Sequence, residues 1–260
     1  MIPMINMSLS PYYSVKMTWG EIHDLLTVTP AIILPLGPTE PCTEFGTMGA
    51  SALSCFALAN KLSEKKKMLL SPIIPFGYSI AFRTFDGCGT LAAKTLTALL
   101  IDLLKSWVSQ HIFTFIILNS ISDNNCMVNE ATQRIISRNP ETRFCILNWH
   151  QMSEVRSFIA SACSGNEYGR SEYGILSMAA YLDRSFVRQP SSPKKNNVIA
   201  DQKAYQRWQK TGRDPEKFRK LFPNSQTSSI AHKFNAQFGQ ELFFHISDKF
   251  EKTLKLELNI

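Results

Sequence analysis

Short apolar runs of strand length alternate with segments of helical periodicity over most of this chain. The runs 31–36, 112–118 and 143–149 are rich in Ile, Leu and Phe, and the first two lead directly into polar loops. Apolar residues at helical spacing then follow each of these two loops. Repeated strand–loop–helix units predict an α/β fold with right-handed connections and a mostly parallel central sheet flanked by helices.

Helices are predicted where apolar residues recur every three or four positions. Thr18 and Glu21 have the spacing of a capping box, in which each side chain accepts a bond from the backbone N–H of the other residue, so a helix is expected to begin after Thr18. A further apolar stretch spans 68–74. The other predicted helices cover 50–63, 95–108, 127–137, 214–221 and 231–258.

Length and composition are those of a globular protein with one large domain. The chain has 260 residues, of which 44% are hydrophobic and 19% charged, enough to bury a substantial core. Its longest apolar runs are far shorter than the roughly 20 residues that span a bilayer. No basic segment followed by an apolar block marks a signal peptide at the N-terminus. We therefore expect a single domain over 1–260, a cytoplasmic location and no membrane partner.

The segment 188–229 differs in composition from the rest of the chain. It is rich in Lys, Gln, Ser, Pro and Asn, with Trp208, Phe218 and Phe222 as isolated apolar anchors. A lid, a subunit-contact insertion or a plain surface excursion would each have this composition. Part of the net charge of +7 lies here. No nucleic-acid recognition motif accompanies the charge, so we expect solvated loops and helix ends and no nucleic-acid partner.

Polar side chains follow the first two apolar runs. Glu40 and Cys42 lie in the glycine-bearing loop after 31–36, and Asp123 follows 112–118. Open α/β sheets bind ligands beyond the carboxyl ends of their strands, so this pattern favours a functional site. An ordinary strand–loop–helix connection would give the same pattern.

Three stretches resemble motifs of the creatininase family, and Gly77 and Ser79 in the loop 76–90 match part of a fourth, G-x-S-x-E-H. The stretch 31–51, AIILPLGPTEPCTEFGTMGAS, resembles the first family signature, which reads roughly LPLGSTEQHGPHLPLGTD. The stretch 119–124, NSISDN, stands where the family has N-G-H-G-G-N or N-G-H-x-E-N. Gly169, Glu172 and Leu176 match a third motif, H-A-G-x-x-E-T-S-x-x-L.

The resemblance covers about 18–183 and 230–258 of the chain. It implies the creatininase fold, a three-layer α/β domain. It also implies small amide, cyclic amide or formamide substrates, and assembly into homo-oligomers, hexamers among them.

Most family positions that hold metal ligands carry other residues here. Cys42 stands at a metal-binding His, Ser51 at the Asp that bridges two metal ions, and Ile121 at a further His. Glu167 stands at another His, and Asp123 at a ligand Glu. A binuclear centre needs three or four His or carboxylate ligands per ion. The resemblance therefore implies at most one weakly held divalent ion, Zn or Mn. The six cysteines show no CxxC spacing that would add a zinc knuckle or a disulfide framework.

The predicted catalytic residues are Glu40, Asp123 and Glu172, which would also be the ligands of any single metal ion. A carboxylate in a desolvated pocket has a raised pKa and can act as a general acid or base. Each also has a structural explanation. Glu40 can accept backbone N–H bonds, Asp123 can cap a turn, and Glu172 can stabilise a helix start.

The predicted substrate-binding residues lie in these motifs, beside a strand end or in the insertion. Cys42, in a loop expected to be exposed, is a candidate nucleophile, but no base accompanies it in the motif and a buried thiol is the simpler explanation. His150 follows a strand and would face the pocket or be structural. The full predicted set is Cys42, Ser51, Asn124, Glu167, His150 and Trp208.

Two classes of function stay open. One is an enzyme of small-molecule metabolism that acts on an amide, a cyclic amide or a related C–N bond in a carboxylate-lined pocket with a depleted or absent metal site. The other is an inactive homologue that binds a ligand or a partner subunit. The presence of three carboxylates at three motif positions favours the enzyme.

Overall fold

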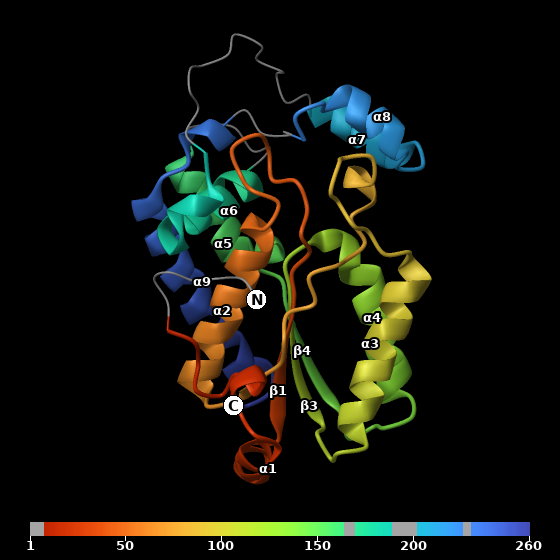
Figure 1. Cartoon of the computed structure of the whole chain (residues 1–260), viewed down its shortest axis with the longest axis vertical. Helices are drawn as coiled ribbons and strands as arrows, with labels where there is room; N and C mark the ends of the chain where they lie inside the picture. Colours follow the sequence, from red (N-terminus) through yellow and green to blue (C-terminus); the bar gives the residue numbers. More distant parts are fainter. Residues whose placement is uncertain (1–7, 164–169, 189–201, 226–229) are drawn as a thin grey trace.

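The computed structural model describes residues 8–163, 170–188, 202–225 and 230–260, and its centre is a four-stranded parallel sheet (Figure 1). The strand order is β2-β1-β3-β4. The strands are β1 (Ala31–Leu36), β2 (Leu69–Leu70), β3 (Thr114–Asn119) and β4 (Arg143–Leu147). The predicted α/β fold with a mostly parallel sheet is confirmed.

The register of β1 and β3 brings their two polar loops to the same edge of the sheet. All six residues of each strand are buried, as expected of apolar strands covered on both faces. Ala31 pairs with Thr114 and Leu36 with Asn119, so both strands end at the same level. Gly37 follows β1 where a Cβ would come within 2.8 Å of the Cys55 Cβ. A larger residue could not make this exit from the strand.

Two layers of helices cover the faces of the sheet (Figure 1). Side chains alternate along β1, so Ile33 joins the core on one face and Ile32 the core on the other. One layer holds α2 (Ala50–Lys66), α5 (Ser153–Ala162), α6 (Arg170–Leu182) and α9 (Ala236–Glu257). The other layer holds α3 (Ala93–Val108) and α4 (Asn125–Ile136).

Helix α1 (Trp19–Val28) precedes β1 and lies at the lower end of the molecule in Figure 1. The predicted capping box of Thr18 and Glu21 is present at its start. None of the helices in the described part of the chain has the length and apolar character needed to cross a bilayer.

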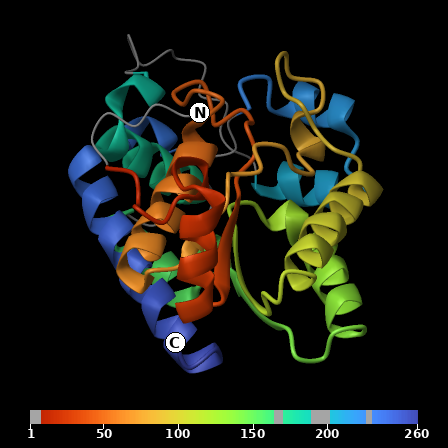
Figure 2. The ribbon, with the colours of Figure 1, turned by 60° about the horizontal axis from the view of Figure 1, so that its bottom comes forward.

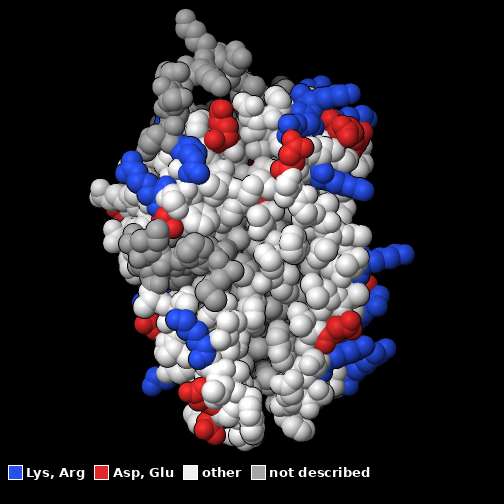
Figure 3. Space-filling view, viewed as in Figure 1, with Lys and Arg blue, Asp and Glu red and all other residues white. Residues whose placement is uncertain are grey.

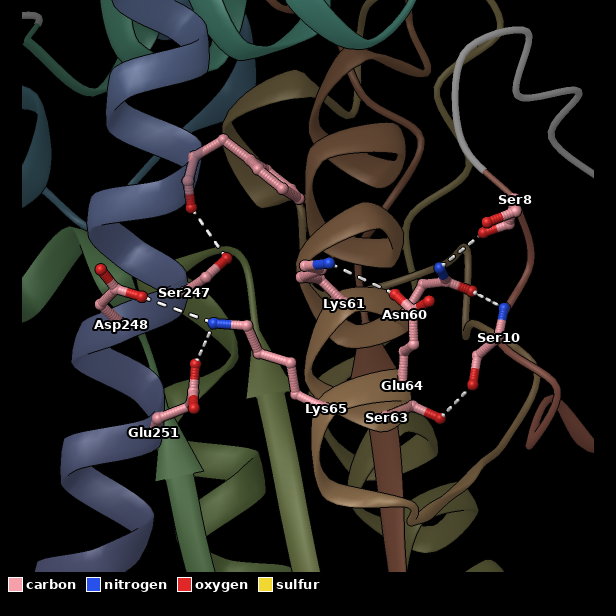
Figure 4. A network of polar contacts seen from close by, with 11 residues as sticks. Ser8, Ser10, Asn60, Lys61, Ser63, Glu64, Lys65, Ser247, Asp248 and Glu251 are labelled. Atoms are coloured by element: carbon pink, nitrogen blue, oxygen red, sulfur yellow. Dashed lines mark hydrogen bonds and ion pairs between the residues drawn. The ribbon is translucent and has the colours of Figure 1, made fainter.

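Polar contacts connect α2 to the N-terminal segment and to α9 (Figure 4). The Ser10 backbone N–H donates to Asn60 Oδ1 at 2.8 Å. Lys65 Nζ lies 3.5 Å from Asp248 Oδ1 and also pairs with Glu251. The Ser10–Asn60 bond is buried, whereas Lys65 and its two partners are partly exposed.

Two predicted elements are shorter in the structure. The apolar stretch 68–74 contributes only the two residues of β2, because prolines at 72 and 75 lack the N–H that a ladder needs. The predicted helix 231–258 begins at Ala236. The side chain of Asn235 accepts bonds from the N–H groups of Gln237 and Phe238 and so caps α9 there.

Helices α7 (Gln202–Lys210) and α8 (Pro215–Leu221) form a hairpin, residues 202–225, that packs on the loop 76–90. Figures 1 and 2 both place the hairpin beside this loop. The predicted helix 214–221 is thus confirmed. The anchors predicted to be isolated instead share an aromatic cluster with the loop. The buried members of this cluster are Ala81, Phe85, Ala204, Trp208, Phe218 and Phe222.

Candidate functional site

Glu40 is a buried carboxylate just beyond the carboxyl end of β1. Only 7% of the residue is exposed, and its Oε2 accepts a 2.6 Å hydrogen bond from Ser79 Oγ. Its backbone N–H donates to the Met48 carbonyl at 2.9 Å, which holds the loop after β1. Burial raises the pKa of Glu40 to about 7, the Ser79 bond opposes this rise, and the charge of Asp123 adds to it. Glu40 can therefore exchange a proton near neutral pH.

Ser79 is a site residue that was not among the predicted ones. It lies in the loop 76–90, where its N–H donates to Thr90 Oγ1 at 2.9 Å. The only sequence signal was the match of Gly77 and Ser79 to a glycine–serine pair in a family motif. A serine in a loop is too common for that match alone to indicate a contact with Glu40.

Asn124, a predicted substrate-binding residue, holds two loops together in the structure. Its Oδ1 accepts from the Tyr78 N–H at 2.8 Å, and its Nδ2 donates to Asn119 Oδ1 at 3.2 Å. Gly77 packs on this amide, because a Cβ there would come within 2.9 Å of Asn124 Oδ1. Both polar ends of Asn124 are thus bonded within the protein, and the residue joins the carboxyl end of β3 to the loop that carries Ser79.

Asp123 lies in the 3-10 helix η3 (Ser122–Asn124) after β3 and is paired with a residue of the hairpin. Arg213 Nη1 donates to Asp123 Oδ1 at 2.9 Å, and about a third of each side chain remains exposed. Burial raises the pKa of Asp123, and the guanidinium of Arg213 opposes that rise. The pair joins positions 90 residues apart, which sequence patterns do not reveal.

Tyr205 of α7 lies near the same charges. Burial raises its pKa to about 12, and the negative charges of Asp123 and Glu172 contribute to the rise. The hairpin therefore brings a phenol as well as a guanidinium to the carboxylates.

Cys42 is buried rather than exposed, which corrects the expected position of this candidate nucleophile. It is 4% exposed and belongs to the apolar core on the α2 face. Burial raises the pKa of its thiol well above the ordinary range, and the charges of Glu172 and Glu40 raise it further. A thiol is a nucleophile as its thiolate, so Cys42 is poorly suited to that role. The effect of both charges on this thiol shows that Glu40 and Glu172 each lie near Cys42.

Glu172 lies in the first turn of α6 and is half-buried. Its charge raises the pKa of both Cys42 and Tyr205. Glu172 therefore lies in the same region as Glu40 and Asp123. Its position at a helix start also fits the structural explanation.

His150 follows β4 in the 3-10 helix η4 (Trp149–Gln151). Its ring centroid lies 3.5 Å from that of Trp149. Burial lowers its pKa to about 4, so the imidazole is neutral at physiological pH. The buried Nδ1 has no hydrogen-bond partner among the described residues. This is the feature of His150 that fits the predicted role in ligand binding.

Three other predicted residues give no support to a role in binding. Ser51 is 3% exposed near the start of α2. The Trp208 indole N–H donates to the Asp214 carbonyl at 2.6 Å, and the ring belongs to the aromatic cluster. Trp208 also lines a cavity of about 280 Å³ on the hairpin, whose lining includes none of the three carboxylates. Glu167 lies outside the described residues.

The charge of Asp123 acts on Glu40, and Glu172 acts on Cys42 and Tyr205 beside them, but the three carboxylates do not form a chelating group. No set of three His, Cys, Asp or Glu residues in the described ranges is arranged to hold a metal ion. An oxygen of Glu40 is bonded to Ser79 and one of Asp123 to Arg213. The single weak metal site considered for Glu40, Asp123 and Glu172 is therefore not assembled here.

Comparisons with known proteins agree with this architecture. The family model described as creatinine amidohydrolase, Creatininase, matches residues 15–254. A crystal structure of creatinine amidohydrolase matches at 15% identity over 95% of this chain and 97% of that one, with a TM-score of 0.72. A structure titled "Creatininase Mn" matches at 15% identity over 95% and 98%, with a TM-score of 0.73.

A putative creatinine amidohydrolase from Bacteroides fragilis matches at 17% identity over 96% of this chain and 98% of that one, with a TM-score of 0.66. No curated protein sequence matches. At these identities the solved structures establish the fold, while the family model covers nearly the whole chain. The chain belongs to the creatininase family.

Proposed function

We propose that this protein is an amidohydrolase-type enzyme that cleaves a C–N bond of a small, non-peptide amide or cyclic amide without a binuclear metal centre. Family membership supports the reaction class. The observation that carries the proposal is the buried Glu40 carboxylate, bonded to Ser79 at 2.6 Å beyond the carboxyl end of β1. Buried carboxylates of this kind are candidates for general acid–base catalysis.

Glu40 has the properties that a general base for hydrolysis requires. With a pKa of about 7, it is partly ionised at neutral pH and can take a proton from a water molecule as the oxygen attacks the amide carbon. It can then return that proton to the leaving nitrogen when the C–N bond breaks. Ser79 holds the carboxylate in one orientation, and neutral His150 is available as a hydrogen-bonding group for a ligand.

The residues present do not fit the metal ions that the family implies. One matching structure is titled "Creatininase Mn". In this chain Ile121 has no donor atom, Ser51 has a hydroxyl instead of a carboxylate, and Asp123 is paired with Arg213. The donor set thus lacks the His ligands and the bridging carboxylate that hold two such ions, and Glu40 is already bonded to Ser79. No step of the proposed reaction involves a metal.

An inactive homologue that binds a ligand or a partner is the alternative. The Asp123–Arg213 pair favours it, because a carboxylate already bonded to an arginine is less available to a substrate. Turnover distinguishes the two, since a binding protein would retain a ligand without converting it. Assembly into an oligomer stays a prediction from the resemblance, and sedimentation equilibrium tests it.

The proposal is tested by comparing Glu40→Gln with Glu44→Gln. Glu44 is an exposed carboxylate in the same loop and provides the matched control. Wild-type protein is incubated with creatinine, other cyclic amides and formamides, and NMR follows the ring-opened acid from each cyclic amide and the free amine and formate from each formamide. We expect Glu40→Gln to lower the rate on the accepted substrate by about 10²–10⁴-fold and Glu44→Gln to leave it unchanged. Hydrolysis by Glu40→Gln at the wild-type rate would exclude Glu40 as the base.

A further inference from the structure

The α7–α8 hairpin contacts the loop 76–90 through aromatic rings. The centroid of Phe218 lies 5.5 Å from that of Phe82, in an edge-to-face arrangement. The Arg219 guanidinium lies 4.1 Å from the centroid of the Phe85 ring. These contacts are apolar or cation–π in character and place the hairpin against the loop. They do not explain the ionic contact that the hairpin also makes.

The ionic contact comes from the turn between the two helices. Arg213 has a φ of 54° and Gly212 a φ of 83°, so two successive residues adopt left-handed conformations. Such a conformation is uncommon for a residue with a side chain and persists where surrounding contacts fix it. The bond from Trp208 Nε1 to the Asp214 carbonyl fixes this turn from the aromatic cluster. The turn thereby presents Arg213 to Asp123.

The Arg213–Asp123 pair lies at the proposed site. Asp123 contributes to the raised pKa of Glu40, so the two carboxylates lie within electrostatic reach of each other. Arg213 is the cation bonded to Asp123, and the charges of Asp123 and Glu172 raise the pKa of Tyr205 in the same hairpin. The hairpin, which is distant in sequence, therefore places two polar side chains near the carboxylates.

We propose that Arg213 is a positioning residue that fixes the Asp123 carboxylate and holds the hairpin closed over the carboxylates, so that a ligand enters when this ion pair opens. The role of the opening in ligand entry rests on the proposed function. The opening itself is a property of the hairpin and can be measured without any reaction.

The cysteines of the chain allow the opening to be measured in the native protein. Cys88 is half-buried against the aromatic cluster that joins the hairpin to the loop 76–90. Cys126 is exposed, whereas Cys42, Cys55 and Cys145 are buried in the main core. Alkylation with iodoacetamide, followed for each cysteine by peptide mass spectrometry, therefore separates hairpin opening, reported by Cys88, from global unfolding, reported by Cys42, Cys55 and Cys145.

We expect Arg213→Gln to increase the alkylation rate of Cys88 by about fivefold, because modification of a protected group follows the population of the open form. The rates at Cys126, Cys42, Cys55 and Cys145 should not change. Loss of a nearby positive charge disfavours thiolates, so an increase cannot come from thiol chemistry.

Three variants serve as controls for this effect. Asp123→Asn removes the same pair from the other side and should give the same increase, with no further increase in the double variant. Arg213→Lys keeps the charge and should restore most of the protection. Lys210→Gln removes one exposed positive charge from the same hairpin and should behave as wild type.

A change below twofold at Cys88 in both Arg213→Gln and Asp123→Asn would overturn the proposal. An equal increase at Cys42, Cys55 and Cys145 would also overturn it, because the pair would then support only global stability. If the hairpin opens selectively in the variants but the wild-type protein hydrolyses no amide, the role of Arg213 in holding the hairpin stands and the proposed hydrolase function is excluded. The two proposals can therefore fail separately.

Discussion

The sheet with its helical layers and the α7–α8 hairpin are stabilised by different kinds of contact. The sheet packs aliphatic side chains on both faces, and all six residues of both β1 and β3 are buried. The hairpin has a small aromatic cluster, and seven of its residues are Lys or Arg against two that are acidic. Figure 3 shows basic side chains, with acidic ones among them, at the upper right of the molecule, where Figure 1 places the hairpin. The candidate site combines carboxylates from the first region with a cation from the second.

The largest expected effect is a difference in the free energy of unfolding when the same substitution, Phe→Ala, is made in the sheet and in the hairpin. Phe115 of β3 and Phe218 of α8 are both almost fully buried. Phe115→Ala should lower the free energy of unfolding by about 3–5 kcal/mol, because it leaves a cavity in the main core. Phe218→Ala should instead expose residues 202–225 to hydrogen exchange and change global unfolding by less than about 1 kcal/mol.

Denaturant unfolding and hydrogen exchange on both variants measure this difference. Equal losses of global stability would mean that the hairpin and the sheet unfold as one cooperative unit.

The next effect concerns pH and lies in the first region. The pKa of Glu40 is about 7 in the folded protein, against an ordinary value of 4.5. The folded state therefore favours the protonated carboxyl. The stability from this group is complete below pH 4.5 and is lost as the pH rises through 7, by about 3 kcal/mol. Glu40→Gln should remove this decline. Thermal melts from pH 4 to 8 test it, and an unchanged slope in the variant would contradict the raised pKa.

The elements of the first region could be predicted because their signals are local. An unbroken apolar run ended by Gly37 identified both ends of β1, and the spacing of Thr18 and Glu21 identified the start of α1. The start of α9 was placed five residues early, because the side chain of Asn235 overrides the apolar pattern that continues before it. A local sequence pattern predicts the helix or strand in which it lies and the residues that cap it.

The candidate site was predicted only in part, for a physical reason. The expected parallel sheet made it possible to place the loops with Glu40 and Asp123 at its carboxyl edge, and the register of β1 and β3 agrees with that placement. The partners of these residues, Ser79 and Arg213, come from a loop and a hairpin 39 and 90 residues away. Their positions depend on tertiary contacts that have no periodic signal in the sequence.

A smaller effect tests how closely the helices of the first region pack. A Cβ on Gly239 of α9 would lie 1.9 Å from the Ser177 carbonyl oxygen of α6. Gly239→Ala should therefore cost about 2–3 kcal/mol, because two backbones must separate. Gly20→Ala in α1 is the control, since nothing lies within 4 Å of its Cβ. It should stabilise by about 0.5–1 kcal/mol. Equal effects in urea unfolding would refute the close contact.

The smallest effect lies between the two regions. The Arg213–Asp123 pair is about one-third exposed on both sides, so solvent screens it. Arg213→Gln should lower the global free energy of unfolding by less than about 1 kcal/mol. A loss of several kcal/mol in urea unfolding would show that the pair stabilises the sheet as well as the hairpin.

The central claim is that Glu40, without metal ions, acts on a C–N bond. The most direct measurement is the turnover of the accepted amide by protein treated with EDTA, with metal content determined on the same sample. We expect full activity at far less than one Zn or Mn per chain and no increase when Mn²⁺ or Zn²⁺ is added back. Activity that is lost on chelation and returns only with two bound ions per chain would contradict the account.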